Sequence, residues 1–117
     1  MDSILTSIKK MLGIAEDYTQ FDMDITVLIN NSLNTLNQLG VGVEGFAISG
    51  KDTTWNDFLG DFSKYSGMVQ TYVYVKVKLA FDSNSMSGAV LDAHKEMARE
   101  SEWRIRTQVD LMKKEGN

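Results

Sequence analysis

Residues 87–114 read SGAVLDAHKEMARESEWRIRTQVDLMKK, and this stretch decides the class of fold. Its apolar residues recur at three- and four-residue steps, which predicts one long amphipathic helix. They are Val90, Leu91, Met97, Ala98, Ile105, Val109 and Met112. On the other side, three acids each precede a base by four positions, the favourable orientation on a helix surface. The pairs are Glu100–Arg104, Glu102–Arg106 and Asp110–Lys114.

Such a helix is long for its chain. A helix of about 28 residues would extend roughly 42 Å, whereas a globule of 117 residues has a radius of gyration of about 13 Å. Part of the helix is therefore expected to extend beyond its own core and to meet a partner. This favours an assembly protein over an enzyme.

Composition indicates an ordinary globular protein. Hydrophobic residues make up 43% of the chain and charged residues 24%, so we expect a single domain covering residues 1–117. With no cysteine there is no disulfide, thiolate zinc site or cysteine nucleophile. We find neither a signal-peptide pattern nor a run of about 20 apolar residues, and so expect a soluble intracellular protein with no membrane partner.

Charge is distributed unevenly. The net charge is −4; residues 1–94 hold six Lys/Arg against eleven Asp/Glu, and residues 95–117 hold six against five. An acidic body disfavours a protein that binds nucleic acid through phosphate contacts.

The remaining pattern is mostly helical. We predict helices over residues 4–12, capped by Asp2 or Ser3, and over about 22–39. A capping-box-like Thr54–Asp57 pair begins a short helix that holds Trp55. Between these helices lies a loop, about 40–54, in which residues 46–48 are compatible with a short strand. The predicted fold is a small bundle of four to five helices.

Residues 68–81 are ambiguous. Valines alternate with Tyr72, Tyr74, Lys76 and Lys78, which is typical of a strand. However, no second convincing strand is available to pair with it, and an isolated strand leaves its backbone groups unsatisfied. The same residues also fit a helical face, so we predict a helix here.

No residue pattern indicates catalysis, a cofactor or a metal ion. His94 is the only histidine and fits a structural or interface role. Residues 40–45 spell GxGxxG but lack the preceding strand of a dinucleotide site. Trp55 is most simply a core residue, with an interface role as the alternative. Trp103 lies off the apolar stripe near arginines, a combination enriched at protein interfaces.

Several segments together resemble a known family. They are SILTSIKKMLGI at 3–14, FDMDI at 21–25, QLGVG at 38–42, TWNDFLG at 54–60, VQTYVYVKVKLAFD at 69–82 and EWR at 102–104. In this order they resemble the small head–tail connector proteins (neck adaptors or head-completion proteins) of tailed bacteriophages and prophages. The match covers roughly residues 1–110.

The resemblance implies a structural adaptor of the virion neck, present in the host cytoplasm during assembly. It implies docking on the portal protein, self-association into a ring, recruitment of the next neck or tail-completion protein, and passage of DNA without sequence-specific binding. The terminal helix would reach the portal and the middle loop would make neck contacts. The expected interface residues are Trp103, Arg104, Arg106, Val109, Met112, Phe46, Ile48 and Trp55. Truncation after about Ala98 is expected to leave a soluble fold and abolish portal binding. The alternative function is a small helical regulatory or nucleic-acid-binding protein.

Overall fold

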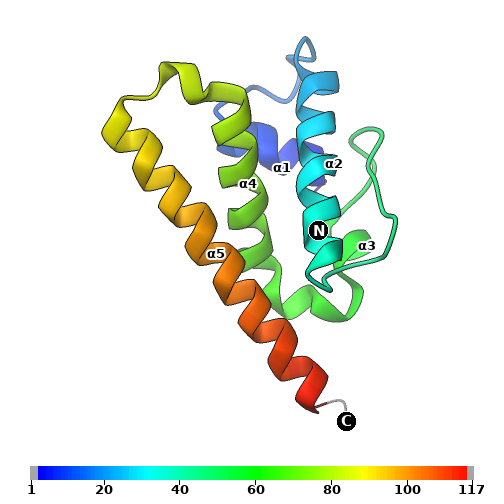
Figure 1. Ribbon diagram of the computed structural model, residues 1–117. Helices are drawn as coiled ribbons and strands as arrows, with labels where there is room; N and C mark the ends of the chain where they lie inside the picture. The colour runs from blue at the N-terminus through cyan, green and yellow to red at the C-terminus, as the bar shows by residue number, and fades with distance from the viewer. Residues whose placement is uncertain (1–2, 116–117) are drawn as a thin grey trace.

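The computed structural model describes the backbone of residues 3–115 and the side chains of residues 3–113 (Figure 1). Five α-helices and two short 3₁₀ helices follow one another along this part of the chain, which confirms the predicted mostly α fold. They are α1 (Ile4–Met11), α2 (Asp22–Gln38), α3 (Trp55–Leu59), η1 (Gly60–Tyr65), α4 (Ser66–Asp82), η2 (Ser83–Ser85) and α5 (Gly88–Glu115).

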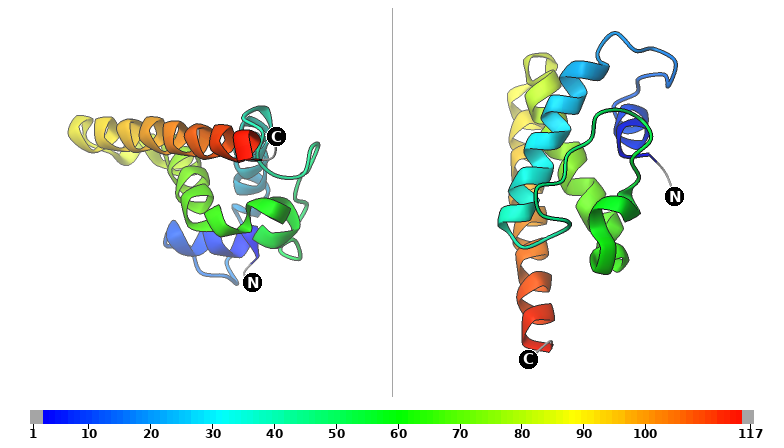
Figure 2. Two further views of the ribbon diagram at one scale, coloured as in Figure 1. Left: turned by 90° about the horizontal axis from the view of Figure 1, so that it is seen from below. Right: turned by 90° about the vertical axis from the view of Figure 1, so that its right-hand side faces the viewer.

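Helix α4 lies at the centre of the molecule. It packs between α5 on one side and α2 on the other, and it also contacts α1 (Figures 1 and 2). This position explains the alternating tyrosine–valine stretch. Residues two apart lie about 200° apart around a helix, and Val73, Val75 and Val77 are all buried because neighbouring helices cover α4 from more than one direction. The helix predicted for residues 68–81 is therefore confirmed, with bounds slightly wider.

The helix ends follow the expected local chemistry. Ser3 caps α1 by accepting a hydrogen bond from the Thr6 amide at 3.2 Å, and Gly13 follows the helix with a positive φ. The Thr54–Asp57 capping box is formed in both directions at the start of α3. At the start of α5, Ser87 accepts a hydrogen bond from the Val90 amide.

The central loop does not contain the short strand expected at residues 46–48. Instead, the side chain of Asn30 pairs with the backbone of Ile48: it donates to the Ile48 carbonyl at 3.0 Å and accepts from the Ile48 amide at 2.8 Å. An amide side chain on α2 thus replaces a neighbouring strand. Within residues 3–115 the β-type pairing is an isolated bridge between Ser3 and Thr54.

Helix α5 spans almost the whole molecule. Its 28 residues would measure about 42 Å, against a longest molecular dimension of 45 Å. Ala98, Ile105 and Val109 are buried on its inner side. The expectation of a rod extending beyond the core is therefore only partly met: from Ala98 to Val109 the helix contributes to the core, whereas its first third, Gly88 to Met97, has no fully buried side chain.

Candidate protein-interaction surface

The outer side of α5 is the most prominent surface candidate. Ile105 and Val109, 2% and 3% exposed, hold the helix against the core. Trp103 precedes Ile105 by two residues and so points to a different side of the helix. Its side chain is 65% exposed, which is unusual for the largest apolar residue type. Arg104 and Arg106 are also exposed, and they flank Trp103 on either side around the helix.

Ion pairs on this surface are fully hydrated. Arg104 pairs with Glu100 at 2.6 Å and Arg99 with Glu96 at 2.7 Å, and all four side chains are more than half exposed. Such pairs contribute little to stability. The Glu100–Arg104 pair was predicted. Of the other two predicted pairs, Glu102–Arg106 is not formed among the described side chains, and Asp110–Lys114 includes a side chain outside them.

Glu102 lies near Tyr72 of α4 and does not pair with Arg106. Glu102 is half-buried, on the side of α5 that faces α4. Burial raises the pKa of the Tyr72 phenol to about 12, and the nearby negative charge of Glu102 contributes to this rise. Tyr72 is buried and Lys78 is paired with Asp82, so neither offers a free stacking or phosphate-binding group to a nucleic acid.

Of the other five predicted interface residues, three are buried in the core and two are half-buried. Trp55 and Ile48 are buried, at 0% and 3% exposed, and Phe46 is half-buried against Phe58, with ring centroids 5.2 Å apart. Burial leaves Trp55 and Ile48 without surface to offer a partner in this conformation. Val109 is likewise buried, and Met112 is half-buried beside it on α5. The middle loop is thus fastened to the core by its apolar side chains.

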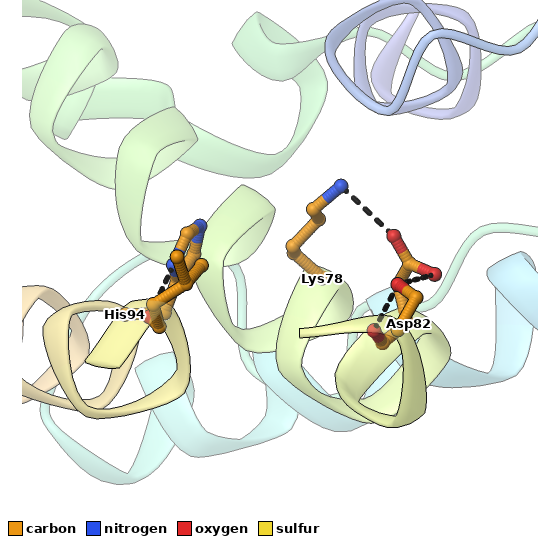
Figure 3. A network of polar contacts seen from close by, with 5 residues as sticks. Lys78, Asp82 and His94 are labelled. Carbon is orange, nitrogen blue, oxygen red and sulfur yellow. Dashed lines mark hydrogen bonds and ion pairs between the residues drawn. The ribbon is translucent and has the colours of Figure 1, made fainter. Parts of the chain in front are cut away.

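A polar network closes the turn between α4 and α5 (Figure 3). Lys78 donates to the Asp82 carboxylate at 3.0 Å, and Ser85 donates to the same carboxylate at 2.7 Å. The hydrogen bonds from Ser85 and then Lys78 lower the pKa of Asp82. His94 lies 3.0 Å from the Val90 carbonyl through Nδ1, which must therefore carry the proton. His94 thus contacts a backbone carbonyl of its own helix, and the structural or interface role expected for it stays a prediction.

Helix α2 carries a surface that the sequence analysis did not single out. Met23 and Val27 are 81% and 54% exposed on its outer side. The signal was available in the sequence as a lack of charge: residues 25–38 contain no Asp, Glu, Lys or Arg.

The remaining sequence motifs have structural explanations. Gly40, Gly42 and Gly45 of the GxGxxG motif all adopt positive φ, and Gly42 lies against Phe58 in the core. The motif therefore forms the turns after α2. Among the described residues, no group of three or more His, Cys, Asp or Glu side chains is placed to hold a metal ion. Within the same part of the chain, none of the helices has the length and apolarity needed to cross a bilayer.

This arrangement defines a small helical protein with an exposed tryptophan, Trp103, on its longest helix. A family model described as "Phage connector protein" matches residues 4–111, nearly the whole chain, and the chain belongs to this family. No curated protein and no solved structure matches it significantly. Membership gives the chain a structural role in the phage connector, as a virion component that associates with other head or tail proteins.

Proposed function

We propose that this protein is an adaptor of the phage neck that docks on the portal ring through the outer side of α5 and links the DNA-filled head to the tail. In this role it recruits the next neck or tail-completion protein and performs no chemistry. Family membership supports a connector role. The outer side of α5 supports the choice of docking surface, because Trp and Arg dominate the binding energy of many protein interfaces.

The exposure of Trp103 carries this proposal. Its side chain is 65% exposed although Ile105, two residues further on, is buried. The core thus fixes the helix in place and holds the indole outward. A large, rigid side chain presented in this way loses little conformational freedom on binding.

Charge supports the proposed passage of DNA. The chain carries −4, and its acidic excess lies in residues 1–94. Like charge discourages a duplex from adhering to such a surface as it passes. We propose that DNA crosses the neck without sequence-specific binding to this protein.

We further propose that residues 1–117 act as one domain. A single cluster of buried apolar side chains, from Ile4 in α1 to Val109 in α5, supports this proposal. Unfolding in urea should then give one cooperative transition at which helicity and tryptophan fluorescence change together. Two separated transitions would contradict a single domain.

Portal binding by surface variants tests the docking proposal. Trp103→Ala should weaken binding to the purified portal ring by about 30-fold, the equivalent of a hot-spot loss near 2 kcal/mol. Arg104→Ala and Arg106→Ala should weaken it to a smaller extent. Lys10→Ala, at an exposed basic residue on α1, is the control and should bind like the parent chain. If Trp103→Ala and the parent chain bind equally well, α5 does not dock through this side.

A further inference from the structure

The outer side of α2 forms an uncharged ridge. Met23, Val27, Asn31, Asn34 and Gln38 recur at three- and four-residue steps and are all exposed; we call them the α2 ridge. No charged residue occurs between positions 25 and 38, in a chain of which 24% is charged. Depletion of charge, together with exposed methionine, is the compositional signal of the centre of a protein interface.

The first half of α5 carries a second apolar surface. Val90 and Met97 are 45% and 44% exposed, lie seven residues apart and therefore share one side of the helix. Ala93, also exposed, lies between them; we call these three residues the α5 stripe. Because Val90, Ala93 and Met97 are all exposed, the chain's own core does not account for these apolar residues.

Charge around the α5 stripe cancels. The charged residues three positions after Ala93 and Met97 are Glu96 and Glu100, and each is paired: Glu96 with Arg99 at 2.7 Å and Glu100 with Arg104 at 2.6 Å. The α2 ridge and the α5 stripe are thus two exposed surfaces with little net charge on a protein of net charge −4. Two copies of an acidic chain repel each other least where uncharged surfaces meet.

We propose that the α5 stripe of one copy packs on the α2 ridge of a second copy. The proposal rests on the neck-adaptor function proposed above, because a ring in the neck requires a contact of this kind between copies. The two helices lie on either side of α4, so each copy can use both surfaces at once (Figures 1 and 2). Contact between two different surfaces is heterologous, and it repeats into a closed ring when the rotation allows.

The level of the two surfaces within the molecule also matches. Helices α2 and α5 both begin at the same end of the molecule, the upper end in Figure 1. The apolar residues Met23 and Val27 lie in the first turns of α2, and Val90 and Met97 lie in the first half of α5. A rotation about an axis running from that end to the other therefore brings apolar residues to the same height on neighbouring copies.

Disulfide trapping tests this contact directly, because the chain contains no cysteine of its own. Val27→Cys and Met97→Cys variants are purified separately, mixed and mildly oxidised. The mixed 27–97 disulfide, identified by mass spectrometry of peptides, should form at least fivefold more than in a mixture of Met97→Cys with Asn56→Cys, an exposed position on α3. The double variant should give a ladder of oligomers. Yields equal to the control, or a predominance of 27–27 and 97–97 disulfides, would overturn the proposal.

Charge substitution provides the second measurement. Val27→Glu and Met97→Glu change exposed side chains, so helicity by circular dichroism should be unchanged while self-association in sedimentation equilibrium falls. A mixture of Val27→Glu with Met97→Lys should associate again. If Val27→Glu leaves self-association intact and weakens only portal binding, the ridge receives a different partner and the proposal is wrong.

These outcomes separate the two proposals. Trp103→Ala should lose portal binding and still give the 27–97 disulfide. Formation of that disulfide by a protein that never binds a portal would refute the docking proposal and leave the contact between copies in place.

Discussion

Gly42 lies directly against the aromatic ring of Phe58: a Cβ atom on Gly42 would lie 2.5 Å from both Cε1 and Cζ of that ring. The amide of the next residue, Val43, donates to the Phe58 carbonyl at 2.9 Å. The loop after α2 is therefore joined to α3 by a backbone hydrogen bond and a close contact that only glycine permits. This is how a flexible-looking, glycine-rich stretch becomes a fixed part of the core.

Gly42→Ala should therefore destabilise the protein. Gly42 has a φ of +80° and no space for a methyl group, so we expect a loss of about 2–4 kcal/mol in the free energy of unfolding from backbone strain and overpacking together. Gly45→Ala is the matched control, because Gly45 has a φ of +74° but no atom within 4 Å of its Cβ position. Its loss should be about 1–2 kcal/mol. Equal losses in urea unfolding would show that contact with Phe58 is unimportant.

Lys9 is a charged residue inside the structure, and its replacement should be costly. The side chain is buried, and its ammonium group lies within 2.9 Å of the Glu16 carbonyl, 2.7 Å of the Tyr18 carbonyl and 2.8 Å of the Asp22 carboxylate. Lys9 thus donates hydrogen bonds to two carbonyls and forms an ion pair with the Asp22 carboxylate, and these contacts hold the connection between α1 and α2 in place.

Lys9→Met removes these bonds and strands the two carbonyls and the carboxylate. The expected loss is about 2–3 kcal/mol of unfolding free energy. Lys10→Met, at the exposed neighbouring position, should change stability by less than about 0.5 kcal/mol. Similar urea midpoints for the two variants would mean that Lys9 does not organise the connection.

Tyr72 should make the protein sensitive to alkali. Because burial raises the pKa of its phenol from 10.0 to about 12, the folded state holds this proton more tightly than the unfolded state does. The resulting stabilisation is complete below pH 10 and is lost as the pH rises toward 12. In the Tyr72→Phe variant, the urea midpoint should therefore fall less steeply than in the parent chain as the pH rises over this interval. An unchanged slope would show that Tyr72 does not ionise on unfolding.

The sequence predicted the helices well because their chemistry is local. The cap at Ser3, the capping box at Thr54 and the stripe through Ile105 and Val109 depend on neighbours within a few residues. It could not predict how Ile48 is satisfied, since the Asn30 side chain that replaces a strand is eighteen residues away. The alternating valines of α4 can all be buried in a helix only because other helices cover α4 on several sides, and local sequence does not encode this packing.

The predicted interface residues differ in the same way, because local spacing determines the exposure of some of them and tertiary packing the burial of others. Exposure of Trp103, Arg104 and Arg106 follows from the helical spacing of α5 relative to Ile105. Burial of Trp55 and Ile48 depends on how the loop and α3 close over the core, which spacing does not encode. The α2 ridge was missed although its lack of charge is plain in the sequence. The strong apolar pattern of α2 marks its inner, buried side, whereas only the lack of charge marks its outer side.

Substitutions on the buried side of α5 should affect folding, and substitutions on its exposed side should affect docking. Ile105 is 2% exposed within the core, so Ile105→Ala should cost about 2–4 kcal/mol of unfolding free energy. Trp103→Ala, at a side chain 65% exposed, should stay within about 0.5 kcal/mol of the parent chain.

Truncation after Ala98, expected from the sequence to leave a stable fold, removes both Ile105 and Val109 and should unfold the protein instead. Urea denaturation of all three variants distinguishes these cases. A large loss of stability in Trp103→Ala would mean that any accompanying loss of portal binding reflects unfolding, and the outer side of α5 would no longer be supported as a docking surface.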